Sequence, residues 1–352
     1  MDRNMKKWHS YKLSDVVRFN PSERLLKGEI AKKVPMDLLQ PYTRGISGFE
    51  MASYTGGSKF RNGDTLMARI TPCLENGKTA YVSMLDEDEV GFGSTEYIVF
   101  RNIEGITDNK FVYYFVTSPW FRDIAVKSMV GSSGRQRVQQ AMLENLVVNL
   151  PPLAEQKQIA GILGALDDKI ELNRCINDNL EEQAKALFNH YFIQNTENLG
   201  EWQDGVLTDI AQYLNGLAMQ KYPAMPNEAG LPVLKIKELG QGQCDTNSDR
   251  CSSLIKPEYI ISDGTIIFSW SGTLLVDIWC GGKCGLNQHL FKVSSAKYPQ
   301  WFVFYWTKHH LNKFIRIAKD KAVTMGHIKR CDLEISKVKI PSKQALVNLD
   351  KL

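Results

Sequence analysis

The chain has 352 residues, of which 43% are hydrophobic and 23% are charged, and its formal net charge is +4. This length fits two domains that each bury a core, and no apolar run approaches the roughly 18 residues that a membrane span needs. Residues 1–7 are polar and unlike a signal peptide, and the seven cysteines lack the spacing of a disulfide framework. We therefore expect a cytoplasmic protein with reduced thiols.

The first predicted domain covers residues 1–150. It opens with an apolar-alternating strand over 11–19, and further short strands follow glycine turns, as at 62–69. An aromatic-rich helix is predicted over 109–117, and a glycine- and serine-rich loop over 130–137 precedes a last strand over 146–150. These elements predict a mixed α/β domain with many loops.

A long helix is predicted over residues 151–195, where the apolar pattern becomes heptad. The adjacent prolines 151 and 152 mark its start, because proline is tolerated before or within the first helical turn. About 38 residues would form a rod of roughly 57 Å. Polar asparagines in the seam can fix register and orientation, or they can mark a frayed or solvent-facing stretch. The predicted partner-helix interface consists of Ile159, Leu163, Leu166, Ile170, Asn173, Asn177, Leu180 and Leu187.

The second predicted domain, residues 196–340, repeats the first. Residues 111–162 and 301–352 align without a gap at an offset of 190. The repeat predicts a strand over 205–213, a strand near 262–269, a helix over 299–308 and a last strand over 338–340. Residues 341–352 then correspond to the start of the long helix, where the chain stops. The predicted architecture is two tandem recognition domains joined by a coiled-coil helix.

Polar loops at matching places in the two copies are candidate DNA contacts. Arginine and glutamine can each form paired hydrogen bonds with base edges, and small residues let a backbone approach phosphate. The alternative is that these are ordinary solvated loops. In the first copy the candidates are Arg69, Lys78, Ser94, Thr95, Glu96, Ser132, Ser133, Arg135, Gln136 and Arg137. In the second copy they are Asn287, Gln288, His289, Lys321, Thr324, His327 and Lys329.

Charge is unevenly distributed along the chain. Residues 301–340 carry nine lysines and arginines against three acids, whereas residues 154–191 carry seven acids against four bases. This pattern suits a polyanion that is held by the domains and kept off the helix, or else a solvated surface without a ligand.

No catalytic or metal-binding motif is recognisable. The stretch 77–79 resembles the end of a phosphate-binding loop, but the residue five positions before Gly77 is Pro72 and not glycine. The cysteines at 244, 251, 280 and 284 have spacings that fit zinc ribbons poorly. We therefore expect no catalytic residue, no metal site and no cofactor in this chain.

The duplicated α/β domain and the helix entry Leu-Pro-Pro-Leu-Ala-Glu-Gln-Lys-Gln-Ile within residues 150–170 resemble the specificity subunit of type I restriction-modification systems. Residues 8–19, 202–213 and 131–137 resemble further parts of that family. The resemblance implies a subunit that reads a bipartite site in double-stranded DNA and makes no bond itself. It implies modification subunits that methylate adenine with S-adenosylmethionine, and restriction subunits that use ATP and Mg.

Two alternatives stay open. The family's second long helix should follow Ser342, so its apparent loss indicates a truncated subunit or a half-type subunit that dimerises through its helix. A scaffold that binds other proteins and not DNA is the alternative from a different functional class.

Overall fold

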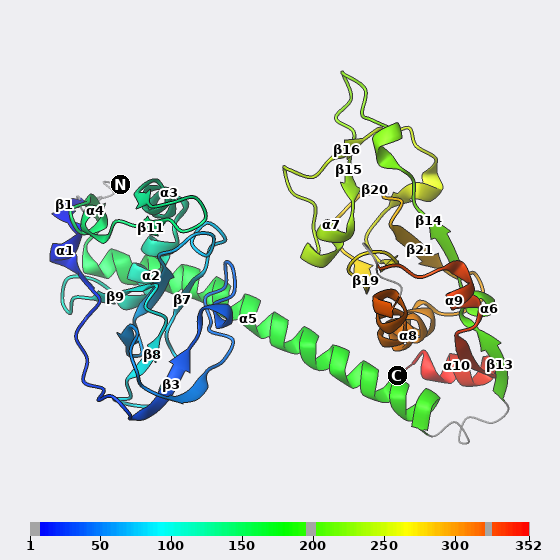
Figure 1. Cartoon of the computed structure of the whole chain (residues 1–352), viewed down its shortest axis with the longest axis horizontal. Helices are drawn as coiled ribbons and strands as arrows, with labels where there is room; N and C mark the ends of the chain where they lie inside the picture. The colour runs from blue at the N-terminus through cyan, green and yellow to red at the C-terminus, as the bar shows by residue number, and fades with distance from the viewer. Residues whose placement is uncertain (1–7, 195–201, 321–325, 352) are drawn as a thin grey trace, which may run out of the picture. The chain divides into compact units, whose positions relative to one another are not determined.

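The computed structural model describes residues 8–194, 202–320 and 326–351 (Figure 1). The chain divides into two compact units, residues 1–177 (unit 1) and 178–352 (unit 2), and the division lies within the long helix. Each unit combines helices with short strands, which confirms the predicted mixed α/β class. Within the described ranges, no helix is long and apolar enough to cross a membrane. The boundaries at 150, 195 and 340 stay a prediction.

Unit 1 contains two four-stranded sheets, ordered β2-β9-β6-β7 and β4-β3-β8-β5, and the pairs β1-β12 and β10-β11. Its strands are β1 (His9–Lys12), β2 (Val17–Phe19), β3 (Ile30–Val34), β4 (Glu50–Ser53), β5 (Lys59–Phe60), β6 (Thr65–Ala68), β7 (Thr79–Tyr81), β8 (Gly91–Gly93), β9 (Tyr97–Asn102), β10 (Met129–Val130), β11 (Arg137–Val138) and β12 (Val147–Leu150). Its helices are α1 (Leu13–Val16), η1 (Met36–Leu38), α2 (Asn109–Thr117), α3 (Pro119–Lys127), α4 (Gln140–Glu144) and the first part of α5 (Leu153–Asn189).

Unit 2 repeats this topology, with sheets ordered β14-β21-β18-β19 and β16-β15-β20-β17 and the pair β13-β22. Its strands are β13 (Trp202–Val206), β14 (Gln212–Asn215), β15 (Leu231–Leu234), β16 (Arg250–Cys251), β17 (Ile260–Ile261), β18 (Thr265–Ser269), β19 (Leu275–Trp279), β20 (Cys284–Leu286), β21 (Leu290–Ser294) and β22 (Lys337–Pro341). Its helices are the end of α5, η2 (His190–Gln194), α6 (Leu207–Ile210), η4 (Met219–Lys221), α7 (Ile236–Gln241), η5 (Pro257–Tyr259), α8 (Gln300–Asp320), α9 (Arg330–Glu334) and α10 (Lys343–Leu349).

The duplication predicted from the sequence is confirmed by matching strand orders in the two units. Helix α4 corresponds to α9, strand β12 to β22, and the start of α5 to the start of α10, all at the predicted offset of 190. Two copies of one topology therefore present equivalent positions that carry different side chains.

The predicted strand over 11–19 is wrong in one respect, because the four-residue helix α1 interrupts it. Leu13 and Val16 are both buried, and a spacing of three residues places them on one side of a helical turn. The same correction applies to 205–213, where α6 begins with a hydrogen bond from the Val206 amide to the Asp209 carboxylate. Helix α8 is also longer than predicted, since it extends to Asp320.

Each unit has its own aromatic core. In unit 1, α2 packs on β6 and β9, and the ring of Phe100 lies 6.0 Å from that of Phe121. In unit 2, Phe268 of β18 stacks at 5.7 Å on Phe314 of α8. Phe192, in the π-helical turn η2, joins the same core and places the end of the long helix within unit 2.

Helix α5 confirms the long helix predicted after the adjacent prolines. It contacts unit 1 through a polar and small-residue face that includes Gln156 and Ala160, both buried. The Tyr114 hydroxyl donates to Asp167 at 2.8 Å, and Arg44 contacts Asp168 at 2.5 Å and Glu171 at 2.6 Å. Part of the acidic surface of the helix is therefore paired within its own unit.

The heptad seam of α5 lies on a different face and is largely exposed. Leu166 is 56% exposed and Ile170 is 47% exposed, and Asn173 and Asn177 are exposed as well. Ile159 is half-buried, and the other apolar seam positions, Leu163, Leu180 and Leu187, are exposed. A partner for this seam stays a prediction.

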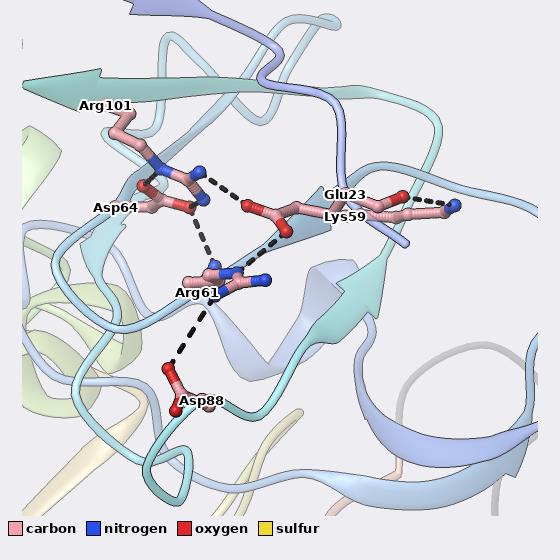
Figure 2. Close-up of polar contacts among 6 residues, drawn as sticks. All are labelled: Glu23, Lys59, Arg61, Asp64, Asp88 and Arg101. Carbon is pink, nitrogen blue, oxygen red and sulfur yellow. Dashed lines mark hydrogen bonds and ion pairs between the residues drawn. The ribbon is translucent and has the colours of Figure 1, made fainter. Parts of the chain in front are cut away.

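A buried ion-pair network fixes an irregular segment of unit 1 (Figure 2). Arg101 of β9 contacts Asp64 through Nε at 2.6 Å and Glu23 through Nη1 at 2.5 Å, and the side chain of Asp64 is 1% exposed. Glu23 also accepts from Arg61 at 2.7 Å, while Lys59 donates to the Glu23 carbonyl at 2.8 Å. Burial raises the pKa of Asp64, although Arg101 opposes this shift. The network joins the segment near Glu23 to the central sheet.

Candidate nucleic-acid interface

Three predicted polar segments of unit 1 meet beside the end of β6. The amide of Arg69 donates to the Glu96 carbonyl at 2.9 Å, and the amide of Val138 donates to the Arg69 carbonyl at 2.9 Å. The residue after Arg69 also forms an isolated antiparallel bridge with Arg137. We call Arg69, Glu96 and Arg137 the junction triad of unit 1. The fold thus brings together two loops that lie about 40 residues apart in the sequence.

Glu96 and Arg137 form a two-pronged ion pair within this triad. Arg137 Nε donates to Glu96 Oε1 at 2.9 Å, and Arg137 Nη2 donates to the same oxygen at 2.7 Å. These hydrogen bonds raise the pKa of Arg137. Arg69 Nη2 donates to the Val138 carbonyl at 3.4 Å, and its buried Nε has no partner among the described residues. The triad therefore carries a net positive charge with donors still available.

The glycine- and serine-rich loop next to the triad is a β-hairpin connection between β10 and β11. Residues 131–135 are exposed, including Ser132, Ser133 and Arg135. Gly131 has φ of +135°, and a Cβ there would lie 2.9 Å from the Arg135 carbonyl oxygen, so glycine is required. The hairpin projects polar side chains and an open backbone to solvent, which suits contact with phosphates or base edges.

The equivalent junction of unit 2 has the same backbone connections and different chemistry. The amide of Trp270 donates to the His289 carbonyl at 3.3 Å, and the amide of Ile328 donates to the Trp270 carbonyl at 3.1 Å. Trp270, His289 and His327 therefore occupy the positions of Arg69, Glu96 and Arg137, and we call them the junction triad of unit 2. The ring of Trp270 lies 5.9 Å from that of His289 and 6.4 Å from that of His327.

A cleft of about 520 Å³ adjoins the junction triad of unit 2. Gln288 and His289 line one part of it, and the Lys235–Asp249 ion pair lines another. His289 Nδ1 is buried and has no hydrogen-bond partner among the described residues. Asn287 is buried and accepts from the His289 amide at 3.4 Å, which orders the turn. The cleft therefore combines charged, amide and imidazole groups that can recognise a polar ligand.

Other predicted DNA contacts are placed outside the two triads. Lys78 donates to the Met36 carbonyl at 2.8 Å, so its side chain is engaged within unit 1. Ser94 accepts from the Glu96 amide at 3.1 Å and shapes the turn, on which Thr95 is exposed. Gln136 accepts through its carbonyl from the Thr71 amide at 3.0 Å, and Lys329 is exposed at the start of α9. Lys321 and Thr324 lie outside the described residues.

Trp270 is the position that the sequence reasoning missed. The predicted segments 62–69 and 262–269 place Arg69 opposite Ser269, whereas the sheet register aligns Gly63 with Gly264 and Arg69 with Trp270. The glycine turns that precede the two strands are the sequence signal that corrects this shift of one residue. The DNA contacts of the predicted residues stay predictions.

Metal-binding groups are not gathered in the described residues, since no group of three or more histidines, cysteines or acids lies close enough to hold an ion. Cys251 and Cys284 are free and buried in unit 2, and burial raises the pKa of both thiols.

A duplicated α/β domain with matched, chemically unequal polar junctions defines a protein with two related recognition units. Residues 5–182 match the family model described as type I restriction modification DNA specificity domain. The chain belongs to this family.

The chain is also similar to curated type I restriction enzyme specificity subunits. The EcoAI specificity subunit of Escherichia coli is 33% identical over 207 residues, which are 57% of this chain and 33% of that protein. The EcoEI specificity subunit of Escherichia coli is 29% identical over 71% of this chain and 43% of its own length. The MjaIX specificity subunit of Methanocaldococcus jannaschii is 25% identical over 72% of this chain and 64% of its own length. The chain thus spans about one to two thirds of these relatives.

A solved structure shares the fold. The crystal structure of the type I restriction-modification system S subunit from M. genitalium covers all of this chain and 90% of its own, with 15% sequence identity and a TM-score of 0.54.

Proposed function

We propose that this chain is the sequence-reading subunit of a type I restriction-modification complex. Each unit contacts one half of a bipartite site in double-stranded DNA, and α5 sets the spacing between the halves. The observation that carries this proposal is the pair of junction triads, which share backbone connections but differ at all three side chains. Equivalent positions with different chemistry are expected where two copies read two different sequences.

The proposal assigns the chemistry to other subunits. Modification subunits with S-adenosylmethionine methylate adenine, and restriction subunits with ATP and Mg cleave DNA, while this chain supplies no catalytic residue, metal or cofactor. The complex acts in the cytoplasm. Family membership supports this division of labour.

The exposed seam of α5 supports a contact in trans. Leu166, Ile170 and Leu180 leave a helix face in water, and a helix with such a face gains stability from a partner. The partner is a modification subunit or a second copy of this chain, as in a half-type subunit.

The test of DNA binding is the dependence of affinity on salt. Arg135→Ala and Lys329→Ala should each reduce the slope of log affinity against log salt by about 0.9, because each removes one phosphate contact. Lys321→Ala should behave in the same way. Lys185→Ala, an exposed lysine on α5, is the matched control and should leave the slope unchanged. If none of the loop variants differs from wild type in slope or affinity, these loops do not contact DNA.

A further inference from the structure

The Glu96–Arg137 pair places a carboxylate at a surface that is proposed to contact DNA. A carboxylate is repelled by phosphates, so a simple phosphate-binding surface gains nothing from Glu96. The side chain of Glu96 is 23% exposed and that of Arg137 is 45% exposed, so both are accessible. The pair also offsets the charge of Arg137, which weakens this arginine as a phosphate anchor.

The geometry of the pair leaves one edge of the guanidinium available. An arginine side chain has five N–H donors arranged on a planar group. Glu96 takes the Nε–Nη2 edge, with contacts at 2.9 Å and 2.7 Å to Oε1 and at 3.0 Å from Nε to Oε2. Among the described residues, no hydrogen-bond partner takes Nη1. The Nη1–Nη2 edge therefore keeps two parallel N–H groups.

Two parallel donors from arginine match the O6 and N7 acceptors of guanine in the major groove. We propose that Arg137 reads a guanine in the half-site of unit 1 and that Glu96 is the positioning residue that holds its guanidinium. This inference rests on the proposed function, because it assumes that unit 1 contacts DNA through its junction triad.

The backbone around the pair supports a fixed orientation. Arg137 is in β11, where the next residue, Val138, is buried and donates to the Arg69 carbonyl at 2.9 Å. Glu96 lies on a turn, and its own amide donates a hydrogen bond to Ser94 Oγ at 3.1 Å. A side chain that is already held in place loses less conformational entropy on binding. The carboxylate thus fixes the orientation in which the guanidinium of Arg137 meets a base edge.

Unit 2 has no equivalent pair at these positions. His289 and His327 replace Glu96 and Arg137, and the ring of Trp270 lies 5.9 Å from that of His289 and 6.4 Å from that of His327. The guanine contact from this position should therefore occur in one half-site only, which provides an internal control in every measurement.

The test is enrichment of a random duplex library by the full chain, followed by sequencing of the bound DNA. Arg137→Lys keeps the positive charge but removes the two parallel N–H donors of the guanidinium. The preference for one G·C pair in one half-site should therefore fall by roughly 10- to 100-fold. The salt slope should stay at the wild-type value. Glu96→Gln should lower the same preference less and raise affinity for unrelated duplexes. Arg174→Lys, which makes the same substitution at an exposed arginine of α5 outside the predicted DNA contacts, is the matched control and should preserve the motif.

Trp270→Ala identifies the half-site of unit 2, because it should alter the other half of the motif. Three results would overturn the inference: an unchanged guanine preference in Arg137→Lys, a uniform loss across both half-sites with a lower salt slope, or a loss in Glu96→Gln alone. The last result would mean that Glu96 itself accepts from a cytosine amine. If wild type enriches no bipartite motif, the proposed function fails, and this outcome is distinct from the other three.

Discussion

Asp64 is a fully buried carboxylate whose one ion-pair partner among the described residues is Arg101. Arg101→Leu would leave Asp64 with only the Arg61 amide as a charge-stabilising donor and Glu23 with only the Arg61 ion pair (Figure 2). Removing one side of a buried pair costs about 3–5 kcal/mol, so we expect a loss of that order in the free energy of unfolding. Urea unfolding, with hydrogen exchange at β6 and β9 to isolate unit 1, measures it.

Two variants serve as controls for this prediction. Lys127→Ala removes an exposed pair with Asp123 and should cost at most about 0.5 kcal/mol. The sheet register places Thr265 and Ser294 of unit 2 where unit 1 has Asp64 and Arg101. Asp64→Thr combined with Arg101→Ser should therefore recover part of the loss. A single Arg101→Leu variant as stable as Lys127→Ala would contradict the assigned role of the network.

His310 on α8 predicts an acid-sensitive unit 2. Burial lowers the pKa of His310 to about 4, against 6.5 ordinarily, although its hydrogen bond to the Lys337 carbonyl at 2.8 Å opposes this. Between pH 6.5 and 4 the imidazole binds a proton in the unfolded chain but not in the folded chain. The contribution of His310 to the free energy of unfolding is therefore fully present above pH 6.5 and is lost as the pH is lowered toward 4. Burial lowers the pKa of His309 in the same direction.

The measurement is the midpoint of urea unfolding of unit 2 at pH 7.5 and at pH 5, with tryptophan fluorescence as the signal. His310→Gln keeps a donor for the Lys337 carbonyl and cannot titrate, so its midpoint should fall less between the two pH values. Equal pH dependence in wild type and His310→Gln would exclude His310 as the cause.

Single residues were predictable where the residue type alone indicated its chemistry. Arg137 and Glu96 were both named as candidates from their loops, but their pairing was not, since it depends on how β9 and β11 meet. Trp270 was missed because tryptophan beside a strand is read as core, and only the alignment with Arg69 marks it.

At the scale of elements, α5 was the most predictable part of the chain. A sustained heptad pattern after two prolines specifies a helix, and the helix runs over Leu153–Asn189. Its docking face was not predictable, because Arg44 lies in an irregular segment more than 120 residues before Asp168 and Glu171. The short helix α1 was also missed, since four residues hold too little periodicity.

The exposed seam of α5 leads to a prediction about association. Leaving leucine-sized side chains in water costs roughly 1.5–3 kcal/mol for each one that a partner would bury. We therefore expect the purified chain to self-associate through α5, as an antiparallel pair. Replacing Leu166 and Ile170 by glutamate should yield monomers while both units remain folded.

The matched control is Leu172→Glu, because Leu172 is 60% exposed on the same helix but outside the seam. Sedimentation velocity of wild type and both variants measures the association, and circular dichroism checks the fold. A wild-type chain that sediments as a monomer, unchanged by the seam variants, would show that the seam does not mediate self-association.

At the scale of the whole molecule, the repeat was predictable because similar residues recur at a fixed offset of 190 along the chain. The unequal chemistry of the two junctions was predictable only in part, since the side chains are visible in the sequence but their grouping requires the sheets. If the proposed function holds, two units with one topology and two different triads imply that each half of the target is specified locally.

This modularity can be tested by replacing residues 1–150 with the first domain of another family member. One half-site should change and the other should stay intact, because unit 2 keeps its own junction triad.

The graft must retain the contacts that hold α5, namely Arg44 with Asp168 and Glu171 and Tyr114 with Asp167. A parallel graft that lacks Arg44 and Tyr114 tests this requirement and should disturb the spacing between half-sites. Enriched duplexes or methylated motifs give the readout, and the guanine read by Arg137 should disappear with the exchanged domain. A graft that altered both halves, or neither, would contradict the assignment of one unit to each half-site.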